Sequence, residues 1–239
     1  MSSSDVPSRI LVVTAHPDDV DFGAAGSVAS WTDAGAEVSY CVVTDGDAGG
    51  FDPAVSREEI AAIRRAEQTE AAKAVGVSDL HWLGYPDGRL EVSIPLRRDI
   101  ARVIRQVRPE RVVTQSPERN WQRIFASHPD HLATGEATMC AVYPDARNPF
   151  AHPELAMERL EAHNVAEVWL MATSDADVWV DVAATYDRKL AALRSHVSQE
   201  TDREGRLGPM LRGWLGANAV AAGLGPEGLA EAFRRVVTA

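Results

Sequence analysis

Four side chains that can bind a metal or transfer a proton stand close together near the N-terminus. The segment AHPDDVDFGAAG contains His16, Asp18, Asp19 and Asp21, and it directly follows the apolar run RILVVT. Carboxylates at this spacing repel one another, so they belong on a solvated surface unless something offsets their charge. A bound divalent cation offsets it, and a tight turn after a strand can direct an imidazole and a carboxylate toward one point. The segment is therefore a candidate metal site.

A second segment of the same kind follows a later strand. It reads SHPDHLATGEA and contains His128, Asp130 and His131, of which His131 stands at the start of an expected helix. Two histidines and one carboxylate form the ligand set of a catalytic zinc that keeps one position open for water. We therefore expect His16, Asp19 and His131 to bind Zn2+. The same ligand set also suits Fe2+.

The other polar groups of these two segments suit the proton transfers of a hydrolysis. Asp18 lies beside the expected ligand Asp19, and we predict that it is the general base that accepts a proton from the attacking water. His128, kept protonated by Asp130, is predicted to stabilise the oxyanion or to protonate the leaving group. Either segment alone is more typical of a plain turn that caps a helix. Their presence together, each after an expected strand, favours catalysis.

The elements that must position these groups alternate between strand and helix. Strands are predicted at residues 9–15, 37–44, 79–85, 111–117, 166–172 and 177–182, and helices at 23–35, 56–76, 96–109, 130–143 and 184–196. Ser56 and Glu59 form a capping-box pattern at the start of the long helix. The alternation predicts an α/β fold with a mostly parallel sheet, in which ligands bind at the carboxyl ends of the strands. We expect one domain over residues 1–239, with 144–164 as an insertion, a loop or a short helix.

The overall charge and composition narrow the class of partner. The chain has 239 residues, 45% of them hydrophobic, and a formal net charge of −11. This acidity disfavours nucleic acid as a partner, and no apolar stretch approaches the length of a membrane span. The polar N-terminus lacks an apolar signal segment, which favours a cytoplasmic protein. The sequence leaves the oligomeric state open, a homo-oligomer included.

Several large or charged side chains are expected to serve the fold alone. Four tryptophans are predicted to lie in the core rather than to stack on sugars, namely Trp121, Trp169, Trp179 and Trp214. Arg64 and Arg65, on the long predicted helix, read as residues of a solvated face.

The paired motifs and their order resemble the LmbE/PIG-L-like zinc-dependent N-deacetylases, a family that includes the deacetylases of mycothiol and bacillithiol biosynthesis. AHPDD after the first strand and HPDH after a later one carry the resemblance, supported by RRAEQTEAAKAVGV, LGYPDG and LRSHVSQ. Together these motifs span residues 9–199. The resemblance implies a Rossmann-like, three-layer α/β/α fold. It also implies metal-dependent hydrolysis of the N-acetyl group of a GlcNAc-like small molecule.

The same resemblance implies roles for individual residues. It implies the metal ligands and the base already named, with His128 oriented by Asp130 as the acid or the oxyanion donor. Arg64 and Asp87 are implied to hold sugar hydroxyls. His196, in the LRSHVSQ segment, is a weaker candidate for the substrate side.

The chain departs from the family pattern at two positions. Val20 replaces the glutamate that many members carry after HPDD, and Ala126 stands where mycothiol-type deacetylases have a tyrosine that helps to stabilise the oxyanion. Either another donor such as Tyr85 replaces that tyrosine, or catalysis depends more on His128. Two alternative functions also stay open. One is an amidase that acts on a thiol conjugate or an antibiotic amide, and the other is a non-catalytic binding protein of the same fold.

Overall fold

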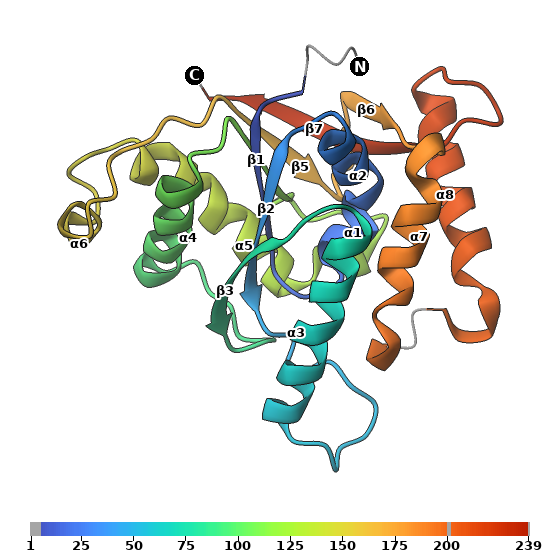
Figure 1. The fold of residues 1–239 in the computed structure, drawn as a ribbon, viewed down its shortest axis with the longest axis horizontal. Coiled ribbons are helices and arrows are strands. Elements are labelled where there is room, and N and C mark those ends of the chain that lie inside the picture. Colours follow the sequence, from blue (N-terminus) through green and yellow to red (C-terminus); the bar gives the residue numbers. More distant parts are fainter. Residues whose placement is uncertain (1–5, 200–201, 239) are drawn as a thin grey trace.

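The computed structural model describes residues 6–199 and 202–238, and its centre is a mixed sheet (Figure 1). In this part of the chain, seven strands lie in the order β3-β2-β1-β4-β5-β7-β6. They are β1 (Arg9–Thr14), β2 (Glu37–Thr44), β3 (Asp79–Tyr85), β4 (Arg111–Gln115), β5 (Glu167–Met171), β6 (Val178–Asp181) and β7 (Ala230–Val237). Strands β1 to β5 pair in parallel, whereas β7 pairs antiparallel with β5 and β6. The predicted α/β class with a mostly parallel sheet is confirmed.

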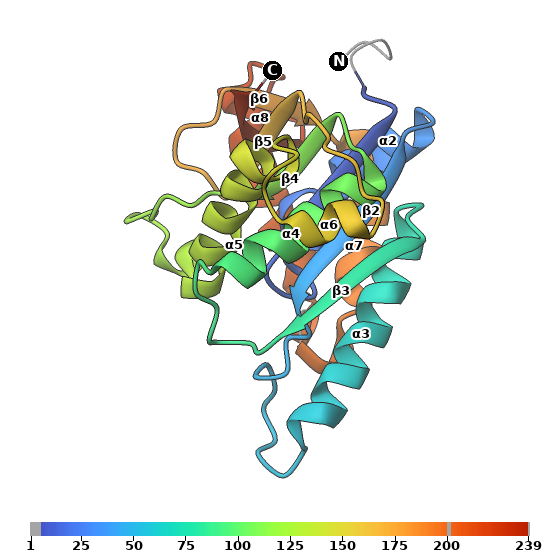
Figure 2. The ribbon, with the colours of Figure 1, turned by 90° about the vertical axis from the view of Figure 1, so that its left-hand side faces the viewer.

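Helices cover both faces of this sheet (Figure 1 and Figure 2). They are α1 (Asp19–Gly23), α2 (Ala25–Asp33), α3 (Arg57–Ala74), α4 (Ile94–Val107), α5 (Pro129–Cys140), α6 (Pro153–Met157), α7 (Tyr186–Arg194) and α8 (Leu207–Ala221). Helices α4, α5 and α6 lie on one face, and the others lie on the opposite face, which gives the expected three layers. Within residues 6–199 and 202–238, no helix combines the length and the apolar character needed to cross a membrane.

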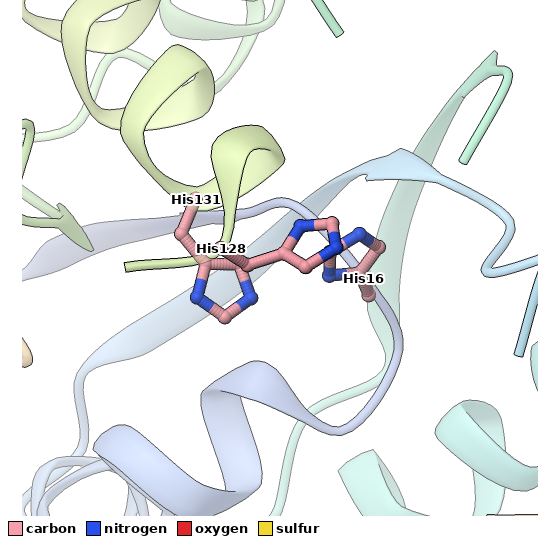
Figure 3. Close-up of side chains that lie close together, drawn as sticks. All are labelled: His16, His128 and His131. Atoms are coloured by element: carbon pink, nitrogen blue, oxygen red, sulfur yellow. The ribbon is translucent and has the colours of Figure 1, made fainter. Parts of the chain in front are cut away.

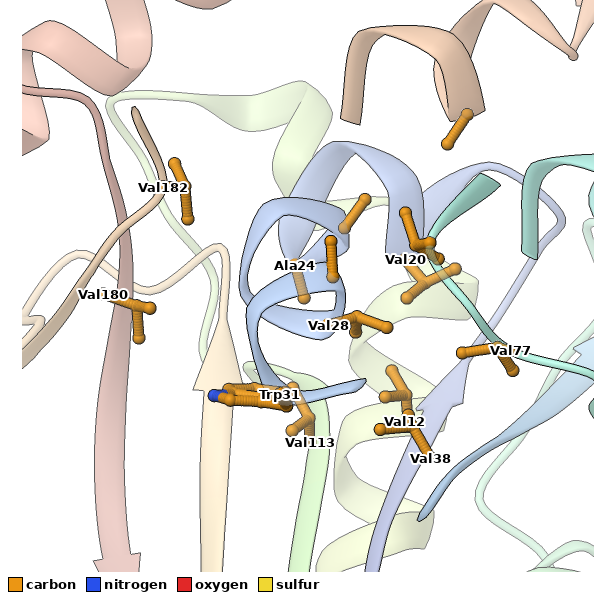
Figure 4. Packing of buried hydrophobic residues seen from close by; sticks show 14 of the residues in the cluster. Val12, Val20, Ala24, Val28, Trp31, Val38, Val77, Val113, Val180 and Val182 are labelled. Carbon is orange, nitrogen blue, oxygen red and sulfur yellow. The ribbon is translucent and has the colours of Figure 1, made fainter. Parts of the chain in front are cut away.

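The central strand β1 shows why the sheet is buried on both sides. Ile10 and Val12 belong to the hydrophobic cluster on one face, and Leu11 and Val13 belong to the cluster on the other. Side chains alternate across a strand, so a continuous apolar run fills both clusters. Figure 4 shows part of the first cluster, which contains Val12 of β1 and Trp31 of α2. The polar residues that follow β1 therefore emerge at the middle of the carboxyl edge of the sheet.

Most predicted elements are present with slightly shifted ends, but the helix expected at 23–35 is wrong in its start. Two helices, α1 and α2, replace it, because Ala24 leaves the helical conformation (φ −146°) between them. Helix α1 therefore begins at Asp19, inside the candidate metal segment. The capping box of Ser56 and Glu59 is confirmed at the start of α3. The region 144–164, predicted as an insertion, a loop or a short helix, contains the short helix α6.

Two elements near the C-terminus, α8 and β7, are absent from the sequence predictions. Helix α8 contains three glycines and a proline, and β7 contains the pair Arg234 and Arg235, so neither has a clear apolar period. Strand β7 nevertheless fills the sheet between β5 and β6. The expected core position is confirmed for Trp169 but is wrong for Trp121, which is 81% exposed in the loop between β4 and α5.

Lys189 is fully buried where α7 meets α1 and β7. Its ammonium donates hydrogen bonds to the carbonyl oxygens of Asp21 (2.8 Å) and Phe22 (2.7 Å) and to Oε1 of Glu231 (2.6 Å). We expect Lys189→Met to lower the free energy of unfolding by about 3–5 kcal/mol, because it leaves the buried carboxylate of Glu231 without its cation.

Chemical denaturation measures this change, and Lys73→Met is the matched control. Lys73 pairs with Glu70 on the exposed face of α3, so its replacement should change the free energy of unfolding by less than about 0.5 kcal/mol. Equal effects of the two substitutions would contradict the structural role of Lys189.

Candidate active site

Three imidazole rings meet at the carboxyl end of the sheet, between the loop after β1 and the start of α5 (Figure 3). The ring centroids of His16, His128 and His131 lie 5.1, 5.2 and 5.5 Å apart. Helix α5 can approach β4 this closely because Gly135 has no side chain. A Cβ at that position would lie 2.4 Å from the carbonyl oxygen of Gln115. The fold thus brings the two histidine segments, which are far apart in sequence, to one place.

Asp19 lies between two of these rings. Its Oδ2 is 3.3 Å from Nδ1 of His16, and its Oδ1 is 3.0 Å from Nε2 of His131. Oδ2 also accepts hydrogen bonds from the backbone N–H of His16 (2.7 Å) and from the side-chain amide of Gln115 (2.8 Å). Burial by itself would raise the pKa of Asp19, but the two histidines hold it well below its usual range. The carboxylate is therefore ionised and fixed in orientation.

The opposite edge of the His16 ring faces two further carboxylates. Its Nε2 lies 3.0 Å from Oδ1 of Asp87 and 3.3 Å from Oδ2 of Asp130. Burial by itself would lower the pKa of His16, but hydrogen bonds with Asp130, Asp19 and Asp87 outweigh it and raise the pKa to about 12. Asp130 in turn accepts hydrogen bonds from two backbone N–H groups of the segment after β3. His16 is thus held by carboxylates on both edges.

Two sets of side chains in the described part of the chain bring their donor atoms within 4.8 Å of one another, as a cation requires. One set is His16, His128 and His131, and the other is His16, Asp87 and Asp130. The predicted ligands share two histidines with the first set, and Asp19 contacts both of those histidines. The site therefore has the nitrogen and oxygen donors of a transition-metal centre.

The hydrogen bonds of the two histidines indicate which atoms would face a metal. A metal-binding imidazole offers one nitrogen to the cation and donates a proton from the other nitrogen to an oxygen. Nδ1 of His131 lies 3.2 Å from the carbonyl oxygen of Ala126, which leaves Nε2 on the side of Asp19. His16 directs Nε2 to Asp87 and Asp130, which leaves Nδ1 on the side of Asp19. Both rings fit a cation bound beside Asp19.

Asp18 precedes α1 in a left-handed backbone conformation (φ 84°), which residues other than glycine rarely adopt. Its N–H donates to Oε1 of Gln68 (2.7 Å), and its Oδ2 accepts a hydrogen bond from Nη2 of Arg64 (3.1 Å). Burial and the charge of Asp19 raise the pKa of Asp18 to about 6, although Arg64 opposes the shift. A carboxylate with this pKa can both accept and release a proton near neutral pH, as a general base must.

His128 is not oriented by the carboxylate of Asp130, which contacts His16 instead. His128 is the N-cap residue of α5, and its Nδ1 accepts a hydrogen bond from the backbone N–H of Asp130 (3.2 Å). Burial, followed by the charge of His16, lowers the pKa of His128. The expectation that Asp130 keeps His128 protonated is therefore wrong. In the neutral ring of His128, Nδ1 accepts the hydrogen bond from Asp130, so Nε2 carries the hydrogen.

Two residues predicted at more exposed positions, Arg64 on a solvated face and His196 on the substrate side, are buried. Arg64 is 4% exposed and donates hydrogen bonds to the carbonyl oxygens of Pro17 (2.7 Å) and Gly46 (3.1 Å), so its assignment to a solvated face is wrong. His196 is fully buried, with Nε2 2.8 Å from Oδ2 of Asp21. This contact removes His196 from a substrate-facing surface.

The two departures from the family pattern have clear surroundings. Val20 is buried in the hydrophobic cluster of its face of the sheet, and Asp21 accepts a hydrogen bond from Gln68 (2.9 Å) in the interior. Tyr85, the suggested replacement for the missing tyrosine at Ala126, donates its hydroxyl to Asp99 (2.8 Å). Tyr85 is therefore engaged by α4 and does not replace that tyrosine here.

Gln115 and Gln68 are functional candidates that the sequence reasoning missed. Gln115 connects the two motif segments, because its Oε1 accepts from the N–H of Ala15 (3.1 Å) and its amide donates to Asp19. It is the last residue of β4, a strand-end position where a polar side chain is informative. Gln68 stands four residues after Arg64, and this spacing puts both side chains on one face of α3.

Comparisons with known proteins agree with this geometry. Residues 11–142 match the PIG-L family model, described as GlcNAc-PI de-N-acetylase. The chain is 32% identical over 191 residues to diacetylchitobiose deacetylase of Thermococcus kodakarensis, covering 80% of this chain and 70% of that protein. It is 34% identical over 198 residues to a probable N-acetyl-alpha-D-glucosaminyl L-malate deacetylase 2 of Bacillus cereus, covering 80% and 83%. Its structure resembles N,N'-diacetylchitobiose deacetylase from Pyrococcus horikoshii with a TM-score of 0.86 and 29% identity, covering 98% and 85% of the two chains.

Proposed function

The chain belongs to the PIG-L family of de-N-acetylases, and from this premise we propose that it is a metal-dependent hydrolase. It removes the N-acetyl group from a GlcNAc-like small molecule and releases acetate and a free amine. The observation that carries the proposal is the position of Asp19, in contact with both His16 and His131, directly after Asp18 on the same turn. This arrangement combines a cation site with an adjacent free carboxylate, as a water-activating centre needs.

We propose His16, Asp19 and His131 as the ligands of a zinc ion, with Fe2+ as the other metal that the donor set suits. When bound, the metal supplies Lewis acidity to the amide carbonyl and to the attacking water.

The protein side chains around the metal have separate proton-transfer roles in this proposal. Asp18 accepts the proton of the attacking water and delivers it to the leaving amine, while Arg64 and Gln68 hold it in place. Nε2–H of His128 donates to the carbonyl oxygen as negative charge develops on it. Asp130 is a positioning residue, because its carboxylate orients His16.

The substrate side is proposed from the family resemblance together with the geometry. Asp87 contacts His16, and the N–H of Asp87 is bound by Asp47 (2.9 Å), so its position is fixed beside the metal site. Arg64 lies near the same site, because its guanidinium donates hydrogen bonds to the carbonyl oxygens of Pro17 and Gly46. We propose that these two side chains contact the sugar. The amino-sugar deacetylases among the relatives favour this function over an amidase of thiol conjugates and over a non-catalytic protein.

The test of this function is a count of products. Metal-reconstituted protein is incubated with N-acetylglucosamine, diacetylchitobiose and N-acetylglucosaminyl malate, and acetate and primary amine are measured separately. We expect equal amounts of the two products, and no release after chelation of the metal. Absence of product from every N-acetyl sugar, with stoichiometric metal present, would refute the proposed deacetylase.

Gln115 provides a prediction about metal affinity. Replacement by leucine removes the amide that donates to Asp19 Oδ2, and the backbone N–H of His16 then remains as a donor to this oxygen. We expect Gln115→Leu to weaken zinc binding by about 10- to 100-fold, as is common when a residue that orients a ligand is lost. Competition with a chromogenic chelator measures this change. Gln199→Leu is the control, because Gln199 bonds to the carbonyl oxygen of Gly49 away from the ligands, and equal affinities of the two variants would contradict the role of Gln115.

A further inference from the structure

An apolar pocket of about 340 Å³ opens directly beside Asp19 and His131. Its size lies at the lower end of the range for small-molecule sites. The apolar side chains that line it are Phe22, Phe125, Met171, Leu211, Trp214 and Leu215. An acetyl group contributes a single methyl beyond its carbonyl carbon, so it leaves most of this volume unfilled.

The pocket wall is held together by contacts between segments that are distant in sequence. Phe22 of α1 lies 6.5 Å from Trp214 of α8, measured between ring centroids. The guanidinium of Arg123 lies over the ring of Trp214 (5.0 Å) and over that of Phe125 (5.6 Å), which links α8 to the loop before α5. These contacts make a built aromatic wall rather than a chance gap.

Three polar side chains that line the pocket, Lys189, Glu231 and Asn218, already have partners within the protein. Lys189 bonds to Glu231 and to two backbone carbonyls, and Glu231 also accepts from the N–H groups of Gly26 and Ser27. The side-chain amide of Asn218 donates to a backbone carbonyl of β7 (3.0 Å). These three groups do not need a ligand to satisfy them, and the guanidinium of Arg123, which also lines the pocket, lies over two aromatic rings. An apolar guest can therefore lie against them without leaving these three groups unpaired.

The pocket lies on one side of the candidate metal site, and the proposed sugar contacts lie on the other. Asp19 and His131 line the pocket, whereas Arg64 and Asp87 do not. Asp87 instead contacts His16 at the edge of the ring that faces away from Asp19. The two substituents of an amide carbonyl carbon point in different directions. If the amine-bearing sugar lies toward Asp87, the acyl chain extends into the pocket.

We propose that this pocket is an acyl subsite that binds an aliphatic N-acyl chain longer than acetyl. The proposal rests on the proposed function, and it assigns specificity for the acyl group to Trp214, Phe22 and Leu211. Most of this wall comes from α1 and α8. The substrate class then includes, besides N-acetyl sugars, N-acylated amino sugars whose acyl chain has several methylene groups.

Binding to an inactive enzyme tests this subsite independently of turnover. The metal-loaded Asp18→Asn variant is titrated by calorimetry with N-acetyl-, N-butanoyl- and N-hexanoylglucosamine. We expect the affinity to rise roughly fourfold for each added methylene, because each one leaves water for an apolar wall. In the Trp214→Ala background the rise should fall below about twofold for each methylene.

Two further variants keep the test independent of folding defects. Met210→Ala removes an exposed apolar side chain from the same helix outside the pocket, and it should leave the chain-length dependence unchanged. Ala232→Leu fills the pocket from β7 and should abolish the advantage of hexanoyl over acetyl. Thermal melting of each variant identifies any that have lost the fold.

Two results would overturn the acyl subsite. One is an affinity that does not rise with acyl length in an enzyme that still releases acetate, which refutes the subsite and leaves the deacetylase intact. The other concerns a hexyl glycoside of N-acetylglucosamine. If the hexyl glycoside binds more tightly than N-acetylglucosamine through Trp214, and N-hexanoylglucosamine does not, the pocket binds the opposite end of the sugar. If affinity rises with acyl length but no N-acyl sugar is hydrolysed, the proposed function alone is refuted.

Discussion

Replacing Asp18 with asparagine should lower kcat by about 10²- to 10⁴-fold, the range expected for loss of a general base. Asparagine keeps the shape of the side chain, can still accept the hydrogen bond from Arg64, and tolerates the left-handed backbone of this position. It has no basic carboxylate, however, so the proton of the attacking water loses its acceptor. The fold and the metal content should be unchanged.

The measurement combines amine release with elemental analysis of the same sample. Asp52→Asn is the matched control, because Asp52 is an exposed carboxylate of the loop between β2 and α3, and its Oδ1 accepts a local hydrogen bond from the N–H of Ala54 that asparagine preserves. Near-normal kcat in Asp18→Asn would show that another residue is the general base. A parallel loss of metal would instead make Asp18 a ligand.

His131→Ala should remove both the metal and the activity. The substitution deletes Nε2, the atom 3.0 Å from Asp19, and leaves only His16 and Asp19 of the proposed ligands. We expect metal affinity to fall by more than about 100-fold, because loss of a residue that only orients a ligand already lowers it by up to about 100-fold. Turnover should fall to background at the metal concentrations that saturate the unmodified enzyme.

Elemental analysis and chelator competition measure this effect, and His81→Ala is its control. His81 lies on β3, is half-buried and pairs with Asp79 (3.2 Å) away from the site. It should keep full metal content. Zinc and iron added back to chelated enzyme then identify which metal supports turnover. Stoichiometric metal in His131→Ala would refute the proposed ligand set.

The sequence predicts the part of the site that depends on local pattern. The apolar run of β1 indicates a buried central strand, and the strand-end rule then puts His16 and Asp19 at an edge where other polar segments meet. The pairing of His131 with Asp19 follows from the same rule. These predictions need only the periodicity of the chain and the chemistry of the side chains.

The sequence does not predict the contacts that orient the site. Gln115 is 96 residues from Asp19, and Gln68 is 50 residues from Asp18, so neither contact has a local signal. Asp130 was expected beside His128, its neighbour in sequence, but the start of α5 turns its carboxylate toward His16. Which carboxylate meets which imidazole depends on how α5 packs against β4, and adjacency in sequence does not determine it.

The left-handed backbone of Asp18 sets the stability of the fold against the proposed catalytic role of this residue. A backbone with φ of 84° suits glycine best, and other residues adopt it at a cost of order 1–3 kcal/mol. Glycine at this position would relax the turn and remove the proposed base in the same step. The residue best for folding and the residue best for hydrolysis are thus different here. In this proposal, some stability of the fold is given up to keep the carboxylate of the proposed base beside the candidate metal site.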